Sequence, residues 1–174
     1  MDFILETERL ALRAWGRDDA EALFELTRDA DTMRYVGNGK PWADLGRAHE
    51  WLGWMGDSQR ERGYSRWAVV EKDGGRVVGL CGFFGVLGKV DFGYLLARDC
   101  WGRGYATELG RAALRHGFER LNFEEVVART APENHASRRV LEKLGFEFRG
   151  LVYHEFDRQD VASYRLSRTD FNAG

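Results

Sequence analysis

Two hydrophobic periods alternate along the chain, the two-residue period of strands and the 3.6-residue period of helices. Strand-like alternation or short apolar runs cover residues 9–14, 66–71, 77–85, 90–96, 125–130, 146–156 and 161–168. In residues 9–14, Leu10 and Leu12 fall on one side and polar or small residues on the other, which predicts a half-buried strand. In residues 90–96, Phe92 and Tyr94 face opposite to Asp91.

Helical spacing predicts helices over about residues 18–26, 44–63, 105–121 and 134–144, with a turn or two at 30–35. Asp18, followed three residues later by Glu21, resembles a capping box at the first of these starts. Asn134 is expected to cap the final helix, and Gly145 to end it. The helix over 105–121 has the most continuous apolar stripe, and its small residues predict close packing against a sheet.

The order of these elements sets the fold class. A strand and helices come first, then an antiparallel meander with a hairpin at residues 72–75, then helix, strand, helix, strand and strand. This order predicts an α+β (mixed α/β) fold in which helices flank one mostly antiparallel sheet of about seven strands. The sequence shows no linker or repeat, so residues 1–174 are interpreted as a single domain.

Charge and composition exclude several classes of function. The net charge is −2 and no basic run stands out, which argues against binding of nucleic acid. No apolar stretch approaches the roughly 20 residues that span a bilayer, and the N-terminus lacks the features of a signal peptide. We therefore expect a soluble cytoplasmic protein that does not bind membranes. Cys81 and Cys100 are expected to be free buried thiols, and their spacing does not indicate a metal site.

Residues 101–108, WGRGYATE, are the most informative segment. Glycines at 102 and 104 leave no Cβ between the backbone and a ligand. The helix that follows presents unpaired N–H groups and the positive end of its dipole. An apolar strand, a glycine turn and a helix N-terminus together predict an anion site, most naturally for phosphate.

A second cluster about thirty residues later makes this reading specific. Residues 134–146, NHASRRVLEKLGF, together with the glycine turn, resemble the GNAT N-acetyltransferase superfamily, whose members use acetyl-coenzyme A. The start at residues 5–13, LETERLALR, resembles the RimJ/RimL-like branch that contains the ribosomal-protein N-terminal acetyltransferases. The resemblance covers nearly the whole chain and implies the GNAT fold, with the sheet splayed between the strands at 90–96 and 125–130.

The resemblance also implies the donor site. Coenzyme A would lie with its pyrophosphate on the turn and its pantetheine arm in the splayed gap, where the Asn134 amide would bond to it. Ser137 would lie near the thioester sulfur. The implied binding residues are Tyr94, Leu95, Leu96, Gly102, Arg103, Gly104, Tyr105, Ala106, Thr107, Asn134 and Ser137.

Two positions depart from the family pattern. Trp101 replaces the usual Gln or Arg, which leaves a backbone cradle but no phosphate-binding side chain at that position. Leu141 replaces the Tyr that often protonates the leaving thiolate, so this role is assigned to Ser137 or water. Asp91 and Glu155 compete as general base, with Glu155 slightly favoured, and a backbone N–H near Leu95 is expected to stabilise the oxyanion.

These site residues also have purely structural interpretations. Asn134 and Ser137 suit the first turn of any helix, Asp91 could be a paired strand residue, and Glu155 a surface charge. Tryptophans 42, 51 and 54 are expected to pack in the core, or else to wall the acceptor groove.

The main hypothesis is an acetyl-CoA-dependent N-acetyltransferase that works by direct attack in a ternary complex, without a metal. The acceptor would be a protein N-terminal α-amine, or alternatively a small-molecule amine such as a polyamine, an amino acid or an antibiotic. The rival hypotheses are a non-catalytic acyl-CoA-binding module and a different enzyme acting on a phosphorylated metabolite. A monomer and a homodimer are both compatible with the sequence.

Overall fold

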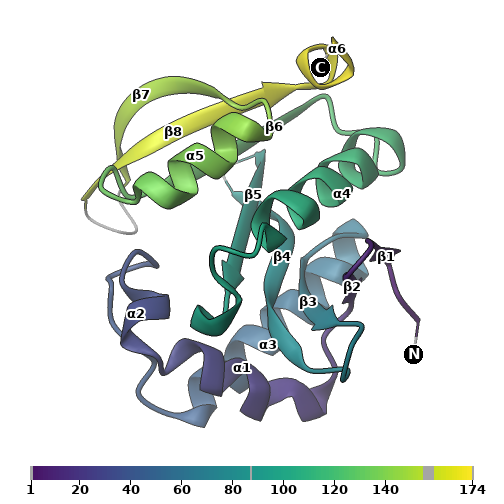
Figure 1. The fold of residues 1–174 in the computed structure, drawn as a ribbon, viewed down its shortest axis with the longest axis vertical. Coiled ribbons are helices and arrows are strands. Elements are labelled where there is room, and N and C mark those ends of the chain that lie inside the picture. The colour runs from purple at the N-terminus through teal and green to yellow at the C-terminus, as the bar shows by residue number, and fades with distance from the viewer. Residues whose placement is uncertain (1, 87, 155–158, 174) are drawn as a thin grey trace.

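One sheet organises the chain. The computed structural model describes residues 2–86, 88–154 and 159–173, and in these residues eight strands lie in the order β1-β2-β3-β4-β5-β6-β8-β7 (Figure 1). The strands are β1 (Leu5–Glu6), β2 (Leu10–Arg13), β3 (Arg66–Glu71), β4 (Val77–Val86), β5 (Lys89–Leu96), β6 (Glu125–Thr130), β7 (Glu147–His154) and β8 (Gln159–Ser167). All neighbours are antiparallel except β5 and β6, which are parallel. The predicted mixed α/β fold with a mostly antiparallel sheet is confirmed.

Helices cover both faces of the sheet (Figure 1). The principal ones are α1 (Ala20–Thr27), α2 (Ala30–Met33), α3 (Leu45–Arg62), α4 (Tyr105–Glu119), α5 (His135–Lys143) and α6 (Arg168–Ala173). Leu80 and Leu95 pack with residues of α1 and α3 on one face. Their strand neighbours Cys81 and Phe92 belong to the larger core under α4 and α5 on the other face.

Three local expectations were wrong. Leu10, Ala11 and Leu12 are all fully buried, because both faces of β2 are covered. Asp18 is not the cap of the first helix. The residue at the N-cap of α1 is Asp19, and its carboxylate accepts the N–H of Gly16. The helix at 134–144 is not the final one, because α6 follows β8. The sheet of about seven strands is borne out by eight in the described residues, where the short β1 is the addition. Both missed elements, of two and six residues, are too short to show a period.

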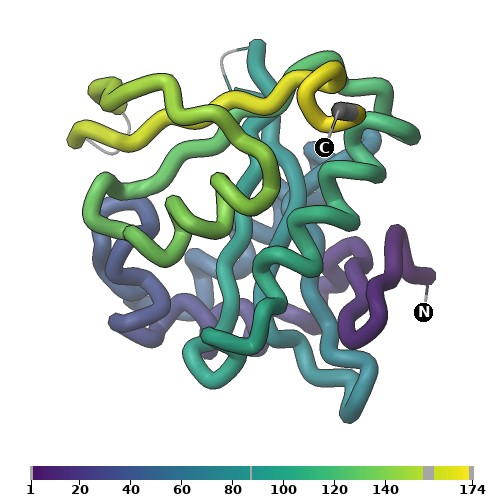
Figure 2. The backbone as a smooth tube through the Cα atoms, turned by 45° about the horizontal axis from the view of Figure 1, so that its top comes forward, coloured from purple at the N-terminus to yellow at the C-terminus, as the bar shows by residue number. Residues whose placement is uncertain are grey.

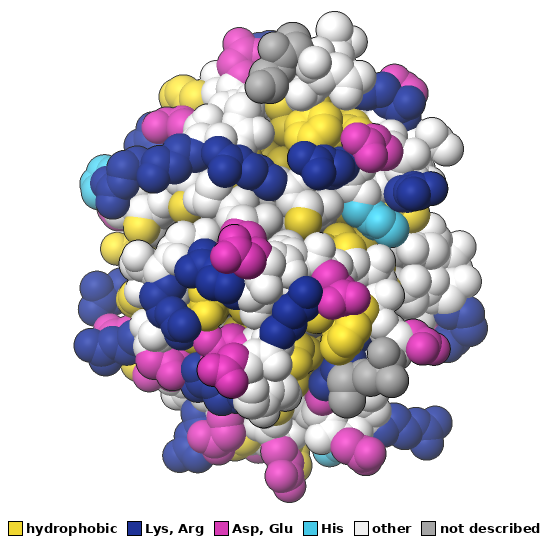
Figure 3. All heavy atoms as spheres, turned by 45° about the vertical axis from the view of Figure 1, so that its right-hand side comes forward, with side chains coloured by type: hydrophobic (Ala, Val, Ile, Leu, Met, Phe, Trp, Pro, Cys, Tyr) yellow, Lys and Arg dark blue, Asp and Glu magenta, His cyan; other side chains and the backbone are white. Residues whose placement is uncertain are grey.

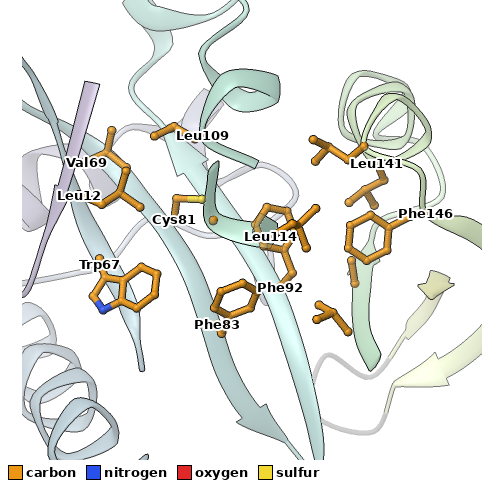
Figure 4. Packing of buried hydrophobic residues seen from close by; sticks show 14 of the residues in the cluster. Leu12, Trp67, Val69, Cys81, Phe83, Phe92, Leu109, Leu114, Leu141 and Phe146 are labelled. Atoms are coloured by element: carbon orange, nitrogen blue, oxygen red, sulfur yellow. The ribbon is translucent and has the colours of Figure 1, made fainter. Parts of the chain in front are cut away.

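The larger core runs continuously from β2 to α5 (Figure 4). Its members come from strands and helices far apart in sequence, and the thiols of Cys81 and Cys100 are buried and free, as predicted. The small residues of α4 pack as closely as expected, although their partners differ. A Cβ at Gly117 would come within 2.9 Å of Phe83 of β4, whereas a Cβ at Gly110 would overlap the Leu144 side chain beside α5.

β5 and β6 diverge after a short pairing. Their parallel register covers Asp91 with Val127 and Phe92 with Ala128, and within the described residues Tyr94, Leu95 and Leu96 have no partner on β6. The sheet therefore opens into a fork between the β1–β5 part and the β6–β8–β7 part (Figures 1 and 2). The predicted splay lies at these two strands.

The surface is mixed in charge. On the face shown in Figure 3, acidic and basic side chains are interspersed, in keeping with the small net charge. Within the described residues, the structure contains no helix that is both long enough and apolar enough to cross a bilayer.

Candidate active site

The glycine turn lies at the open end of the fork, where α4 begins. Gly102 and Gly104 have φ of 73° and 80°, values that glycine adopts without strain. Gly104 is the N-cap of α4 and supplies no side chain to its first N–H groups. A Cβ at Gly102 would meet nothing within 4 Å, and one at Gly104 only the Arg9 side chain at 3.7 Å. Within the described residues, the first N–H groups of α4 thus have no partner and face open space, an arrangement that fits a pyrophosphate.

A clamp from the N-terminal segment holds this turn, and we call it the Glu108 clamp: Thr7, Arg9 and Glu108. The Thr7 hydroxyl donates to Glu108 Oε1 at 2.5 Å, and the Arg9 backbone N–H donates to the same oxygen at 3.1 Å. The Arg9 guanidinium binds Glu108 Oε2 at 2.6 Å and the Arg103 carbonyl at 3.0 Å. Burial would raise the pKa of Glu108, but these hydrogen bonds outweigh it and hold the pKa below its usual value.

A second support fixes the side chains of the turn. Tyr105 donates its hydroxyl to Glu71 Oε1 at 2.8 Å, and Arg103 binds the same oxygen at 2.9 Å. The hydrogen bond from Tyr105, aided by Arg76 and Arg103, holds the pKa of Glu71 below its usual value. The guanidinium groups of Arg9 and Arg103 lie over the Tyr105 ring, 4.6 and 4.4 Å from its centroid. The Arg103 side chain is therefore turned toward Glu71, and its contribution to an anion site would come from the backbone.

The backbone N–H and C=O groups of β5 point alternately toward β4 and toward the gap between β5 and β6. Ala97 N donates to Val78 O on β4 at 2.8 Å, and a residue of an antiparallel strand directs both its backbone groups to the same side. Alternation then directs the N–H of Leu95 toward β4 and those of Tyr94 and Leu96 toward the gap. The Leu96 carbonyl already accepts a 2.8 Å hydrogen bond from the Trp101 indole. The backbone N–H groups near Leu95 that face the gap are therefore those of Tyr94 and Leu96.

The first turn of α5 brings Asn134 and Ser137 to the same gap. Asn134 Oδ1 accepts the Ser137 N–H at 3.1 Å, which is the predicted cap, and its amide nitrogen has no partner in the described part of the chain. The Tyr94 hydroxyl donates to Ser137 Oγ at 3.3 Å, across the gap from β5 to α5. Burial raises the pKa of Tyr94 above its usual value. Sequence reasoning missed this hydroxyl, although the alternation of β5 places Tyr94 with Phe92 on the face toward the helices.

Of the two candidate bases, Asp91 lies among the described residues and is held by arginines. Asp91 is almost fully buried, and its two oxygens bind Arg66 Nη2 at 2.7 Å and Arg129 Nε and Nη2 at 3.0 and 2.8 Å. Glu155 lies outside the described residues. Among the tryptophans, Trp42 and Trp51 pack in the smaller core with Leu95, while Trp54 is 49% exposed under the Arg47 guanidinium.

Comparison with known proteins agrees with this geometry. Residues 9–147 match the family model of the acetyltransferase (GNAT) domain. The uncharacterized N-acetyltransferase p20 of Bacillus licheniformis is 32% identical over 85% of this chain and 84% of its own. A GNAT-family acetyltransferase structure from Bacillus anthracis superposes with a TM-score of 0.79 at 25% identity, covering 95% of this chain and 98% of that one.

More distant structures share the fold. The ribosomal L7/L12 α-N-protein acetyltransferase RimL, in complex with coenzyme A, has a TM-score of 0.82 at 19% identity and covers 95% of this chain and 98% of its own. A spermidine N-acetyltransferase from Vibrio cholerae with coenzyme A and spermine has a TM-score of 0.75 at 21% identity, covering 94% and 98%. The chain belongs to the acetyltransferase (GNAT) domain family and is an N-acetyltransferase that uses acetyl-CoA.

Proposed function

We propose that this enzyme acetylates the N-terminal α-amine of a polypeptide by direct attack in a ternary complex. The observation that carries the proposal is the geometry of Asp91, whose two oxygens already bind Arg66 and Arg129, so that neither is directed at an acceptor amine. An acceptor that needs little help from a base suits such a site. A peptide α-amine, with a pKa of about 7.7–8.0, loses its proton far more readily than a lysine-type amine near 10.4.

In this proposal, acetyl-CoA binds in the fork between β5 and β6. The backbone of residues 102–107 would bind the coenzyme A pyrophosphate, and Tyr94, Leu95, Leu96 and Asn134 would bind the pantetheine arm. This assignment is supported by the open space at Gly102 and Gly104 and by the absence, within the described residues, of a β6 partner for β5 beyond Phe92. Acetyl-CoA supplies an activated thioester carbonyl. The N–H group of Tyr94 or Leu96 is the proposed donor to the oxyanion.

The transfer then needs two proton movements. The amine nitrogen forms a bond to the thioester carbonyl carbon, the carbon–sulfur bond breaks, and the amine proton leaves to water or to Glu155. Ser137 donates a proton to the departing thiolate and recovers one from Tyr94, which solvent then reprotonates. The 3.3 Å hydrogen bond and the raised pKa of Tyr94, which keeps its hydroxyl protonated, support this relay. It would replace the tyrosine absent at Leu141.

The activity assay tests the acceptor class. Purified enzyme is incubated with acetyl-CoA and a panel of N-terminal peptides, the same peptides with blocked N-termini, lysine side-chain amines and polyamines, and release of free thiol is followed. We expect turnover with free N-terminal peptides and none with the blocked ones. Turnover with polyamines alone would replace the proposed acceptor by a small-molecule amine, the alternative suggested by the spermidine acetyltransferase that shares the fold.

Donor binding is tested separately by thermal shift. Coenzyme A at about a hundred times its dissociation constant should stabilise by ~2.7 kcal/mol, or roughly 5–11 °C in a chain of this size. Gly104→Glu should abolish the shift, because a side chain and a negative charge would enter the pyrophosphate cradle. Gly74→Glu is the matched control, since Gly74 also has a positive φ and open surroundings but lies in the β3–β4 turn. A full shift in the Gly104 variant would refute the assigned cradle.

A further inference from the structure

Two arginines bind the Asp91 carboxylate at the base of the fork and give this place an excess of positive charge. We call Arg66 and Arg129 the arginine pair. Arg66 reaches Asp91 from β3 and Arg129 from β6, so the two guanidinium groups exceed the carboxylate by one positive charge. The Asp91 side chain is 5% exposed, whereas those of Arg66 and Arg129 are 30% and 22% exposed. The buried charge is negative, and the charge that solvent or a ligand meets is positive.

The sheet is shaped to hold Arg66 in this position. Register aligns Arg66 with Gly82 on β4 and Gly93 on β5. A Cβ at Gly93 would lie 2.9–3.0 Å from the atoms of the Arg66 guanidinium, so only glycine lets the group lie flat across β5. Asp91 pairs with Val127, two residues before Arg129 on β6, and Arg66 aligns with Gly93, two residues after Asp91 on β5, so alternation puts all three side chains on one face.

The guanidinium of Arg66 has N–H donors that do not bind Asp91. Arg66 donates to Asp91 only through Nη2, and its buried Nε has no hydrogen-bond partner in the described part of the chain. A guanidinium carries several N–H donors in a planar fork, which matches the two oxygens of a carboxylate. A buried N–H without a partner is costly, so a ligand oxygen there would be favoured.

The position of the arginine pair places it on the acceptor side. Gly93 directly precedes Tyr94, and the guanidinium over it lies about 7 Å along the strand from Leu95. Tyr94 and Ser137 occupy the opposite face, toward α4 and α5. The arginine pair instead faces the side of α1 and α3, where Trp15 donates its indole N–H to the Arg66 carbonyl at 2.6 Å.

We propose that the arginine pair recognises a carboxylate carried by the acceptor a few atoms from its reacting amine. This inference rests on the proposed function and narrows it to a peptide with an acidic side chain close to its N-terminus. A free amino acid offers the same carboxylate through its own backbone. The same charge would disfavour polyamines, whose remaining ammonium groups would meet guanidinium groups.

The experiment compares matched acceptors in one enzyme. Peptides with Asp or Asn at the second position, and with Glu or Gln at the third, are acetylated and the ratio of kcat/KM for each pair is measured. Alanine against ethylamine forms the free amino acid arm. We expect the acidic peptide to be favoured about tenfold, the effect of one charge-assisted hydrogen bond, and the preference to fall as salt rises.

Variants change this ratio in opposite directions. Arg66→Gln should bring the ratio toward one, whereas Asp91→Asn, which removes the counter-charge but keeps an acceptor oxygen, should increase it. Arg60→Gln, the same change at a surface ion pair of α3, should leave it unaltered. Because each ratio is taken within one preparation, partial unfolding of a variant cancels.

The outcomes separate this inference from the proposed function. Equal rates for acidic and neutral acceptors, or a ratio that Asp91→Asn lowers, would overturn the inference while peptide acetylation stands. If no peptide reacts but small amines do, the proposed acceptor is wrong. The comparison of alanine with ethylamine then tests carboxylate recognition by itself. A preference for alanine over ethylamine would then support carboxylate recognition, and equal rates or a preference for spermidine would reject it.

Discussion

At the scale of single residues, His116 shows how burial alone changes chemistry. The residue lies in the last turn of α4, with its ring edge-on to Trp67 at a centroid distance of 5.7 Å. Burial, together with the nearby charge of Arg120, lowers the pKa of His116 below its usual value. The folded protein therefore holds this imidazole neutral at a pH where the unfolded chain would begin to protonate it.

His116 should make stability fall in mild acid. The unfolded chain binds the extra proton near pH 6.5, so the contribution of His116 is complete above that pH. It is lost progressively as the pH falls from there toward the lower folded pKa. Melting temperatures measured from pH 7.5 to 5.5 should drop more in the wild type than in His116→Gln. The difference should persist in 0.5 M salt, because burial is the larger cause, and parallel curves would contradict this assignment.

The residues of the site were predictable in type but not in partnership. Asn134 could be predicted as a cap from its sequence neighbours, whereas the catalytic roles expected of Asp91 and Ser137 came from the family resemblance. The arginines that bind Asp91 come from strands 25 residues before it and 38 after it, and no local period reports such a contact. Tyr94 was expected to contribute backbone, and the hydrogen bond from its hydroxyl to Ser137 depends on the placement of α5, which no local pattern reports.

At the scale of elements, the Glu108 clamp explains why the N-terminal segment and the glycine turn are related. The strand β2 lies at the edge of the sheet beside the short β1, yet the Thr7 and Arg9 side chains just before it bind the first turns of α4. Glu108 also sits in the first turn of its helix, where a negative charge is favoured by the dipole. The segment at residues 5–13 thus braces the glycine turn and the first turn of α4.

Removing the clamp should affect stability and donor binding together. Glu108→Ala leaves the Thr7 hydroxyl and the Arg9 N–H without their acceptor, which should cost about 1–3 kcal/mol and lower the melting temperature by several degrees. Affinity for coenzyme A, measured by calorimetry, should also weaken. Glu25→Ala, which breaks the exposed pair with Arg28, is the control and should change stability by less than about 0.5 kcal/mol. Equal effects of the two variants would show that Glu108 braces nothing.

Elements long enough to show a full period were the ones that the sequence could predict. The seven longer strands and α3, α4 and α5 span from four to 18 residues, and the predicted ends of α3 near Asp44 and Gly63 and of α5 at Asn134 and Gly145 agree with the structure. β1 exists because Leu5 and Glu6 pair with β2, so its conformation is set by a partner. The splay between β5 and β6 came from the family resemblance, because no pattern within either strand encodes where two strands separate.

At the scale of the whole molecule, the fork weakens the sheet at the place where the donor is expected to bind. In the described part of the chain, the two parts of the sheet share only the Asp91–Val127 and Phe92–Ala128 pairs between β5 and β6. Side chains must therefore join the parts, and Phe92 stacks on Phe146 with ring centroids 5.9 Å apart. The second connection is between helices, where Gly110 of α4 leaves room for Leu144 at the end of α5.

Substitution of Gly110 tests two opposing effects on stability, the gain in helix propensity and the overlap with Leu144. Gly110→Ala would gain up to ~1 kcal/mol of propensity, but its Cβ overlaps Leu144, and we expect a net loss of about 1–2 kcal/mol. Gly53→Ala in α3 is the matched control, because no atom lies within 4 Å of a Cβ there. It should raise the melting temperature by about 2–4 °C.

A double-mutant cycle then assigns the cost to this contact. Leu144→Ala should destabilise the wild type by leaving a cavity, but it should cost less in the Gly110→Ala background, where the new methyl group occupies part of that space. Denaturant unfolding of the four proteins measures the coupling. If the two substitutions add, or if Gly110→Ala stabilises as Gly53→Ala does, the helices do not hold the fork closed. The Phe92–Phe146 stack and the two strand pairs would then have to carry that role.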